Sequence, residues 1–118
     1  MKTNFIIDVP LGNKKEIEKK KFDKISDKMY EEMAMLFQIF SDKTRLRILV
    51  LLDYREYTVT ELCENINISK SAISHQLKIL RAARMVKVRK VRKNSFYSLT
   101  DDHVAKILET TIEHIREE

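Results

Sequence analysis

The sequence predicts a small, mainly helical domain with one short β-hairpin. Glycine and proline occur once each in 118 residues, which leaves little room for irregular loops. Apolar residues recur at intervals of three and four over most of the chain, the spacing of helices with one buried face. In residues 85–100, valines instead alternate with basic residues, which is typical of a half-buried strand.

Residues 1–21 are polar, lysine-rich and weakly periodic, and we expect a flexible N-terminal arm there, followed by one folded domain over residues 22–118. A first helix should run from about residue 23 to 40, with Met29, Met33 and Phe40 on one face. Ser41 or Asp42 can cap a second, strongly apolar helix that ends near residue 53.

Two short helices should follow. Thr58 or Thr60 can begin the first, and Asn67 can end it because asparagine tolerates a left-handed backbone. Ser69 can cap the second, which lies within "SKSAISHQLKILRAARMV". Two short helices joined by a turn of a few residues form a helix-turn-helix pattern, whose second helix enters the DNA major groove.

The next segment, "MVKVRKVRKNSFYSLT", predicts a hairpin with its turn near residues 92–95. A basic hairpin directly after a recognition helix is the wing of a winged helix-turn-helix domain. Charge agrees with this interpretation, because residues 65–100 hold nine Lys or Arg and no Asp or Glu. The rest of the chain holds 14 basic and 18 acidic residues. Such a basic surface is typical of a partner with a phosphate backbone, and the helix-turn-helix pattern indicates double-stranded DNA.

The candidate DNA contacts fall into two groups. Short polar side chains in the first half of the recognition helix can hydrogen-bond base edges, and these are Ser71, Ser74, His75 and Gln76. Basic side chains on that helix and the hairpin should hold phosphate, and these are Lys70, Lys78, Arg89, Lys90, Arg92 and Lys93.

Two of the three histidines, His103 and His114, lie in a final helix that should begin at residues 100–101. Eleven positions are just over three helical turns, so both project from one face, about 16 Å apart along the axis. Zinc–nitrogen bonds are about 2.0–2.1 Å, so one ion cannot bridge both histidines of one chain. Two antiparallel copies of the helix would solve this, with the His103 end of one beside the His114 end of the other.

Each histidine has a carboxylate within reach. Glu117 follows His114 by three positions, and Asp101 converges on His103 only from a non-helical cap. These residues leave two interpretations open, a metal site shared by two chains or ordinary surface groups, since acidic residues often begin helices. The adjacent apolar stripe should pack on the domain and on a partner helix, and it comprises Val104, Ile107, Leu108, Ile112 and Ile115.

The segments "FSDKTRLRILVLL", "NISKSAISHQLKILRAARMVKVRK" and "FYSL", with the final helix, resemble the ArsR/SmtB family of metal-responsive winged-helix repressors. The resemblance covers about residues 22–118. The family's zinc-sensing branch carries Asp-x-His, ten intervening residues, then His-x-x-Glu or His-x-x-His, and Asp101, His103, His114 and Glu117 match all four positions. The resemblance therefore implies a homodimer, formed through N- and C-terminal helices, that Zn(II) releases from operator DNA. It also implies that His75 relays between metal and DNA.

Branches of this family that sense thiophilic metals carry a Cys-x-Cys where this chain has Thr58. The lone Cys63 is better interpreted as a small buried residue. Imidazole and carboxylate ligands favour Zn(II), with Co(II) or Ni(II) possible. The wing also lacks the glycine common at its tip, where Arg92 stands.

A single cysteine, no secretion signal and no apolar run of about 18 residues predict a cytoplasmic protein without a membrane span. An enzyme is not expected, because four protein ligands leave zinc no open position and no nucleophile–base arrangement is present. Two alternatives stay open: a repressor answering to a non-metal ligand or to redox chemistry at Cys63, and a structural zinc that clamps the dimer.

Overall fold

The computed structural model describes residues 24–117. Its elements are α2 (Asp27–Phe40), α3 (Lys43–Tyr54), α4 (Val59–Ile66), α5 (Lys70–Ala82), β1 (Val86–Val91), β2 (Asn94–Leu99) and α6 (Asp102–Arg116). The chain divides into two compact units, Met1–Ala34 and Met35–Glu118, with the boundary inside α2. The expected arm, residues 1–21, lies outside the described residues.

The predicted helix starts are set by side-chain caps. Asp42, Thr58 and Ser69 each accept a hydrogen bond from the backbone N–H three residues later, a group that has no partner inside its helix. Thr58, and not Thr60, begins α4, because Glu61 bonds back to the Thr58 N–H and completes a capping box. The expected start of α2 near residue 23 was wrong, because the helix begins at Asp27, after Ser26 Oγ accepts the Met29 N–H.

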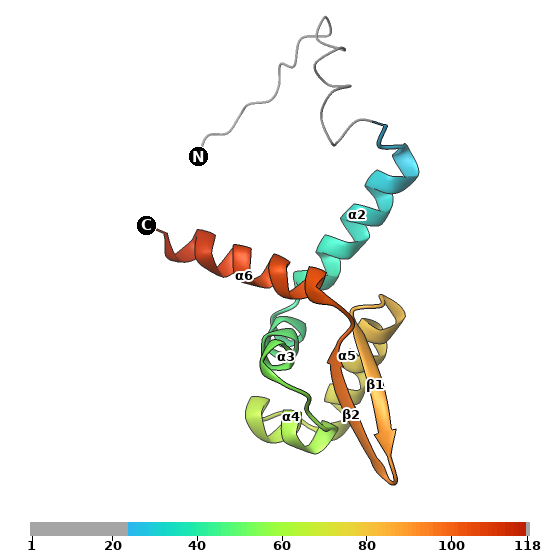
Figure 1. Ribbon diagram of the computed structural model, residues 1–118, viewed down its shortest axis with the longest axis vertical. Helices are drawn as coiled ribbons and strands as arrows, with labels where there is room; N and C mark the ends of the chain where they lie inside the picture. The colour runs from blue at the N-terminus through green and yellow to red at the C-terminus, as the bar shows by residue number, and fades with distance from the viewer. Residues whose placement is uncertain (1–23, 118) are drawn as a thin grey trace, which may run out of the picture. The chain divides into compact units, whose positions relative to one another are not determined.

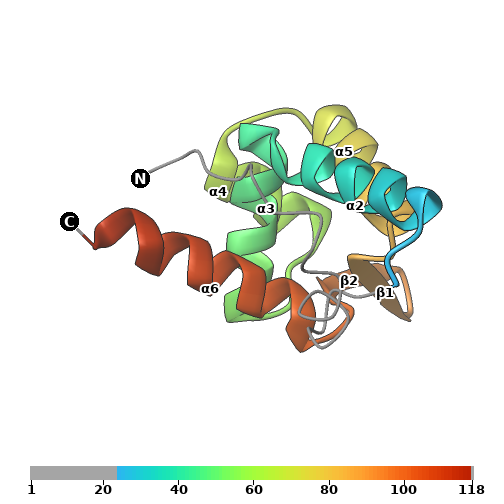
Figure 2. The same cartoon turned by 90° about the horizontal axis from the view of Figure 1, so that it is seen from above.

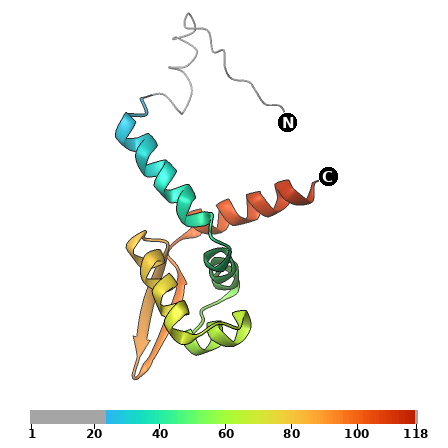
Figure 3. The ribbon, with the colours of Figure 1, turned by 180° about the vertical axis from the view of Figure 1, so that it is seen from behind.

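The turn between α4 and α5 depends on Asn67. Its φ of 68° and ψ of 47° are left-handed, and its N–H donates to the Cys63 carbonyl at 2.7 Å. The chain then reverses within three residues, so α4 packs against α5 (Figure 3). This confirms the helix-turn-helix.

Strands β1 and β2 pair antiparallel from Val86–Leu99 to Val91–Asn94, which leaves Arg92 and Lys93 as a two-residue turn. Arg92 takes the positive φ, 58°, that glycine would otherwise supply. A further bridge between Tyr57 and Tyr97 ties the loop before α4 to β2. The hairpin therefore extends from a fixed base on the helix-turn-helix (Figure 1), and the winged helix-turn-helix prediction is confirmed.

A single core joins α3, α4, α5, β1 and the first half of α6. Its fully buried members are Ile48, Leu49, Leu62, Ile73, Leu77, Leu80 and Met85. Cys63 is half-buried at the edge of this core, close to the small apolar role that the sequence predicts for it. No helix within residues 24–117 has the length and apolar character needed to cross a membrane.

Candidate nucleic-acid interface and metal-binding helix

Helix α5 presents the predicted DNA-contacting side chains on its outer surface. Its buried stripe of Ile73, Leu77 and Leu80 faces the core, which turns the intervening positions outward. Five of the six predicted contacts on this helix are exposed, namely Lys70, Ser71, Ser74, His75 and Lys78. The Oγ atoms of Ser69 and Ser71 lie 3.3 Å apart at the start of the helix.

Gln76 has different surroundings from its neighbours on α5. It is half-buried, and its Oε1 accepts a hydrogen bond of 3.0 Å from Nη1 of Arg45, in the first turn of α3. The same guanidinium donates from Nε to the carbonyl of Ile39 at 2.9 Å. No pattern in the sequence predicts this contact, because the partners are 31 positions apart.

Arg89, on β1, is occupied by an ion pair. Its Nη2 and Nε lie 2.7 Å and 3.1 Å from the two carboxylate oxygens of Glu56, and its guanidinium lies 5.0 Å from the centre of the Phe96 ring. The Arg89 hydrogen bonds hold the pKa of Glu56 below its ordinary value, and the Glu56 carboxylate raises the pKa of Arg89. In this arrangement Arg89 pins the wing to the loop before α4.

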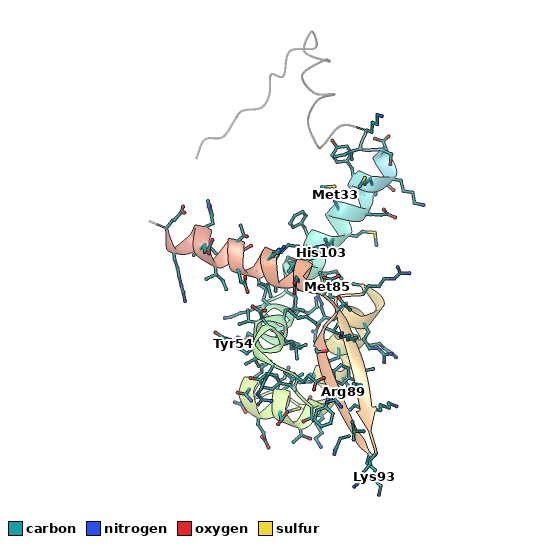
Figure 4. The ribbon with its side chains drawn as sticks, viewed as in Figure 1. Met33, Tyr54, Met85, Arg89, Lys93 and His103 are labelled. Atoms are coloured by element: carbon teal, nitrogen blue, oxygen red, sulfur yellow. The ribbon has the colours of Figure 1, made fainter. Side chains whose placement is uncertain are left out.

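The rest of the wing is open. Lys90, Arg92 and Lys93 are exposed, and within residues 24–117 none of them takes part in an ion pair. Lys93 marks the tip of the hairpin, whereas Arg89 lies in the middle of β1 (Figure 4). These three cations form the predicted phosphate-contacting end of the wing.

A hollow of about 320 Å³ lies between α5 and β2, lined by Ser74, Leu77, Lys78, Arg81 and Tyr97. In this hollow, Arg81 and Tyr97 lie beside the predicted DNA contacts Ser74 and Lys78, although neither residue was selected from the sequence. Arg81 could have been recognised from its place in the acid-free segment. Tyr97 could not, because only strand pairing brings it near α5.

At the start of α6, Asp101 and His103 come together as expected. Asp101 is the N-cap, so its Oδ1 accepts the His103 N–H at 2.9 Å while its Oδ2 lies 3.3 Å from His103 Nδ1. The His103 backbone hydrogen bond lowers the pKa of Asp101, which keeps this carboxyl ionised. Both side chains are exposed. Figure 4 labels His103 at the start of α6.

This pair has the spacing of two metal ligands. Bonds of about 2.0–2.2 Å at a tetrahedral angle place neighbouring ligand atoms roughly 3.3–3.5 Å apart. The distance of 3.3 Å between Asp101 Oδ2 and His103 Nδ1 agrees with this separation of neighbouring ligand atoms. Within residues 24–117 of one chain, no group of three or more His, Cys, Asp or Glu side chains could hold a metal ion. The pair therefore supplies at most half of a four-ligand site.

His114 and Glu117 lie at the other end of the same helix. α6 is continuous from Asp102 to Arg116, so the two histidines are about 16 Å apart along its axis. Glu117 is the C-cap, where the backbone leaves the helix at ψ 110°. One chain thus keeps the two ends of the predicted ligand set apart.

The apolar stripe of α6 is covered only in its first half. Val104 and Leu108 are buried against the core, whereas Ile112 and Ile115 are 36% and 68% exposed. The C-terminal half of α6 projects beyond α3 in both Figure 1 and Figure 2. His114 and Glu117, the predicted ligands at this end of α6, therefore lie beside an uncovered apolar surface.

Beside the buried part of α6, two carboxyl groups from different helices meet. Asp53, near the end of α3, raises the pKa of Glu109 through its carboxyl group, and the negative charges of Glu113 and Asp102 act in the same direction.

The model of a family described as "Bacterial regulatory protein, arsR family" matches residues 42–88. The chain is 35% identical over 112 residues to a transcriptional repressor SmtB homolog of Synechocystis sp., covering 95% of this chain and 85% of that protein. It is 34% identical over 87 residues to a cadmium resistance transcriptional regulatory protein CadC homolog of Staphylococcus aureus, covering 73% and 72%.

Among solved structures, the solution structure of apo-NmtR superposes with a TM-score of 0.67 at 35% identity, covering 75% of each chain. NmtR of Mycobacterium tuberculosis is an HTH-type transcriptional regulator.

Proposed function

The chain belongs to the arsR family of bacterial regulatory proteins and is a DNA-binding transcriptional repressor, and on that premise we propose that it is a homodimeric metal sensor. In this proposal, the metal-free dimer binds operator DNA in the cytoplasm, and Zn(II) bound between two copies of α6 releases it. Co(II) or Ni(II) would suit the same ligands.

One observation carries the proposal: each end of α6 holds one imidazole and one carboxylate, and one end has metal-ligand spacing. The Asp101–His103 pair is preformed at 3.3 Å, and the His114–Glu117 pair lies three turns away. In two antiparallel copies of α6, Asp101 and His103 of one chain would face His114 and Glu117 of the other. Two-fold symmetry would create two such sites per dimer.

The uncovered end of α6 supports dimerisation on this helix. Ile112 and Ile115 lie on the apolar stripe, and the second copy of α6 would cover them. The ligand pairs border the stripe, so apolar packing and metal binding would stabilise the same arrangement of the two chains.

On the DNA side, two α5 helices would enter successive major grooves, with half-sites about one helical turn apart. Ser71, Ser74, His75 and Gln76 would contact bases. Lys70, Lys78, Lys90, Arg92 and Lys93 would hold phosphate, and Arg89 would join them only after leaving Glu56. His75 would relay between the metal site and the DNA; its side chain is exposed and forms no ion pair with α6 within residues 24–117.

A metal ion supplies a strong link between nitrogen and oxygen ligands of two chains. If the linked dimer holds its α5 helices at an unsuitable spacing, metal and DNA weaken each other's binding by the same factor. Couplings of this kind are about 1–3 kcal/mol, or roughly 5- to 150-fold in affinity.

The decisive experiment is an operator-binding titration with and without Zn(II) at fixed salt. The parent should lose affinity on adding zinc, whereas the variant with His103→Ala and His114→Ala should bind DNA equally in both conditions. Lys106→Ala, an exposed change on α6 outside the ligand set, should respond like the parent.

The same titration separates the alternatives. If removing metal abolishes operator binding and dissociates the dimer, the metal is a structural clamp. If the double variant still responds to zinc, the proposed ligands are wrong. If the parent ignores zinc but responds to an oxidant, and Cys63→Ser does not, the signal is redox.

A further inference from the structure

Arg45 donates hydrogen bonds to three segments of the chain, one from its backbone and two from its side chain. Its backbone N–H donates to the Asp42 cap, its Nε donates to the carbonyl of Ile39 at the end of α2, and its Nη1 donates to Gln76 on α5. The side chain is half-buried, so these bonds are partly shielded from water. The recognition helix is therefore tied at Gln76 to the start of α3.

The chemistry of the two side chains fixes the orientation of the Gln76 amide. A guanidinium has five N–H donors and no acceptor, so only the amide oxygen can face it. The amide nitrogen, which carries two hydrogens, is then the end of the amide group that does not face Arg45. A free glutamine can rotate its amide and present either end, whereas Gln76 in this contact has only its amide N–H groups left for a further partner.

This restriction bears on which base the helix can recognise. Adenine is recognised by a glutamine that accepts from N6 and donates to N7 at once. Guanine presents two acceptors, O6 and N7, and no donor in the major groove. A glutamine whose oxygen is held by arginine matches guanine and faces the amino group of adenine with a donor.

We propose that Arg45 is a positioning residue that sets the sequence preference of the recognition helix, by holding Gln76 as a donor that favours guanine over adenine. The inference rests on the proposed function, in that α5 enters the major groove. A phosphate oxygen is the other acceptor that Gln76 could meet there, and it would give affinity without base preference.

The experiment is selection of operator sequences from a randomised library by the full-length, metal-free protein, followed by titrations on matched duplexes that differ at one base pair. The parent should prefer guanine at the position nearest Gln76. Arg45→Met frees the amide, and the preference there should shift toward adenine by about 5- to 150-fold, the usual range for a bidentate base contact.

Two further variants exclude a purely structural role. Gln76→Ala should remove preference at that position, and adding Arg45→Met to it should change no preference further. Gln76→Glu keeps an oxygen for Arg45 and loses the donors, so its preference should move to cytosine, whose N4 amino group donates to carboxylates. This variant tests the inference even if Arg45→Met fails to fold.

The outcomes are distinct. A parent that selects no sequence overturns the proposed function, and the inference with it. A selective parent whose guanine preference survives Arg45→Met, or whose Gln76→Glu variant keeps that preference, overturns the inference alone. A Gln76→Ala variant that binds every duplex more weakly by one factor assigns Gln76 to phosphate and also overturns it.

Discussion

The guanidinium of Arg89 is held by both carboxylate oxygens of Glu56, a residue 33 positions earlier, at 2.7 Å and 3.1 Å. The pair joins the middle of β1 to the loop before α4 and fixes the direction of the wing. A cation that the sequence assigns to phosphate is therefore neutralised within the chain. If Arg89 contacts phosphate as we propose, the operator affinity should depend on the release of Arg89 from Glu56.

Glu56→Gln should strengthen operator binding, because it frees Arg89 for a phosphate. With two copies per dimer, the slope of log affinity against log salt should steepen by about 2. Titration at 50 to 200 mM salt measures this. Glu64→Gln, which removes an exposed carboxylate on α4, is the control. Equal slopes for the two variants would show that only net charge matters.

Metal binding should weaken as pH falls from about 7.5 to 5.5, because protons compete with the ion for imidazole nitrogens. Competition with a chelating dye at each pH measures the affinity. The metal affinity should change less steeply with pH when His103 or His114 is replaced by alanine. Replacing His75 should leave this pH dependence unchanged. A pH-independent affinity would point to ligands other than histidine.

Glu109→Gln should stabilise the protein at neutral pH. The Asp53 carboxyl group raises the pKa of Glu109 above 4.5, so the folded state favours the protonated form. That stability is present below the ordinary pKa and is lost as pH rises through the folded value. The amide carries no charge, so the melting temperature should rise by about 1–4 °C at pH 7 and little at pH 4. An equal gain at both pH values would contradict this electrostatic cause.

Asn67→Ala should destabilise the helix-turn-helix, because a left-handed backbone costs roughly 1–2 kcal/mol with a β-carbon that makes no compensating bond. Asn67→Gly adopts that backbone freely and should stay near the parent. Denaturant unfolding of both variants measures the difference. Similar losses would mean that the asparagine side chain, and not its backbone, is what the turn requires.

Local features of this chain were predictable from its sequence. The caps at Asp42, Thr58, Ser69 and Asp101 depend on residues two or three positions apart, and the left-handed turn depends on Asn67 itself. The convergence of Asp101 and His103 belongs to this class, because a cap geometry brings them together. Start positions were less certain, and α2 begins four residues later than expected because Ser26 precedes it.

The sequence by itself determined the order of helices and wing, the acid-free basic segment and the places of the predicted metal ligands on one helix, because each follows from spacing along a regular backbone. Tertiary structure decided that Arg89 is bound to Glu56, that Gln76 is held by Arg45, and that Asp53 meets Glu109. The physical reason is that these polar contacts join different elements. They form only after apolar packing has fixed the distance between those elements. A short-range sequence pattern does not predict that distance.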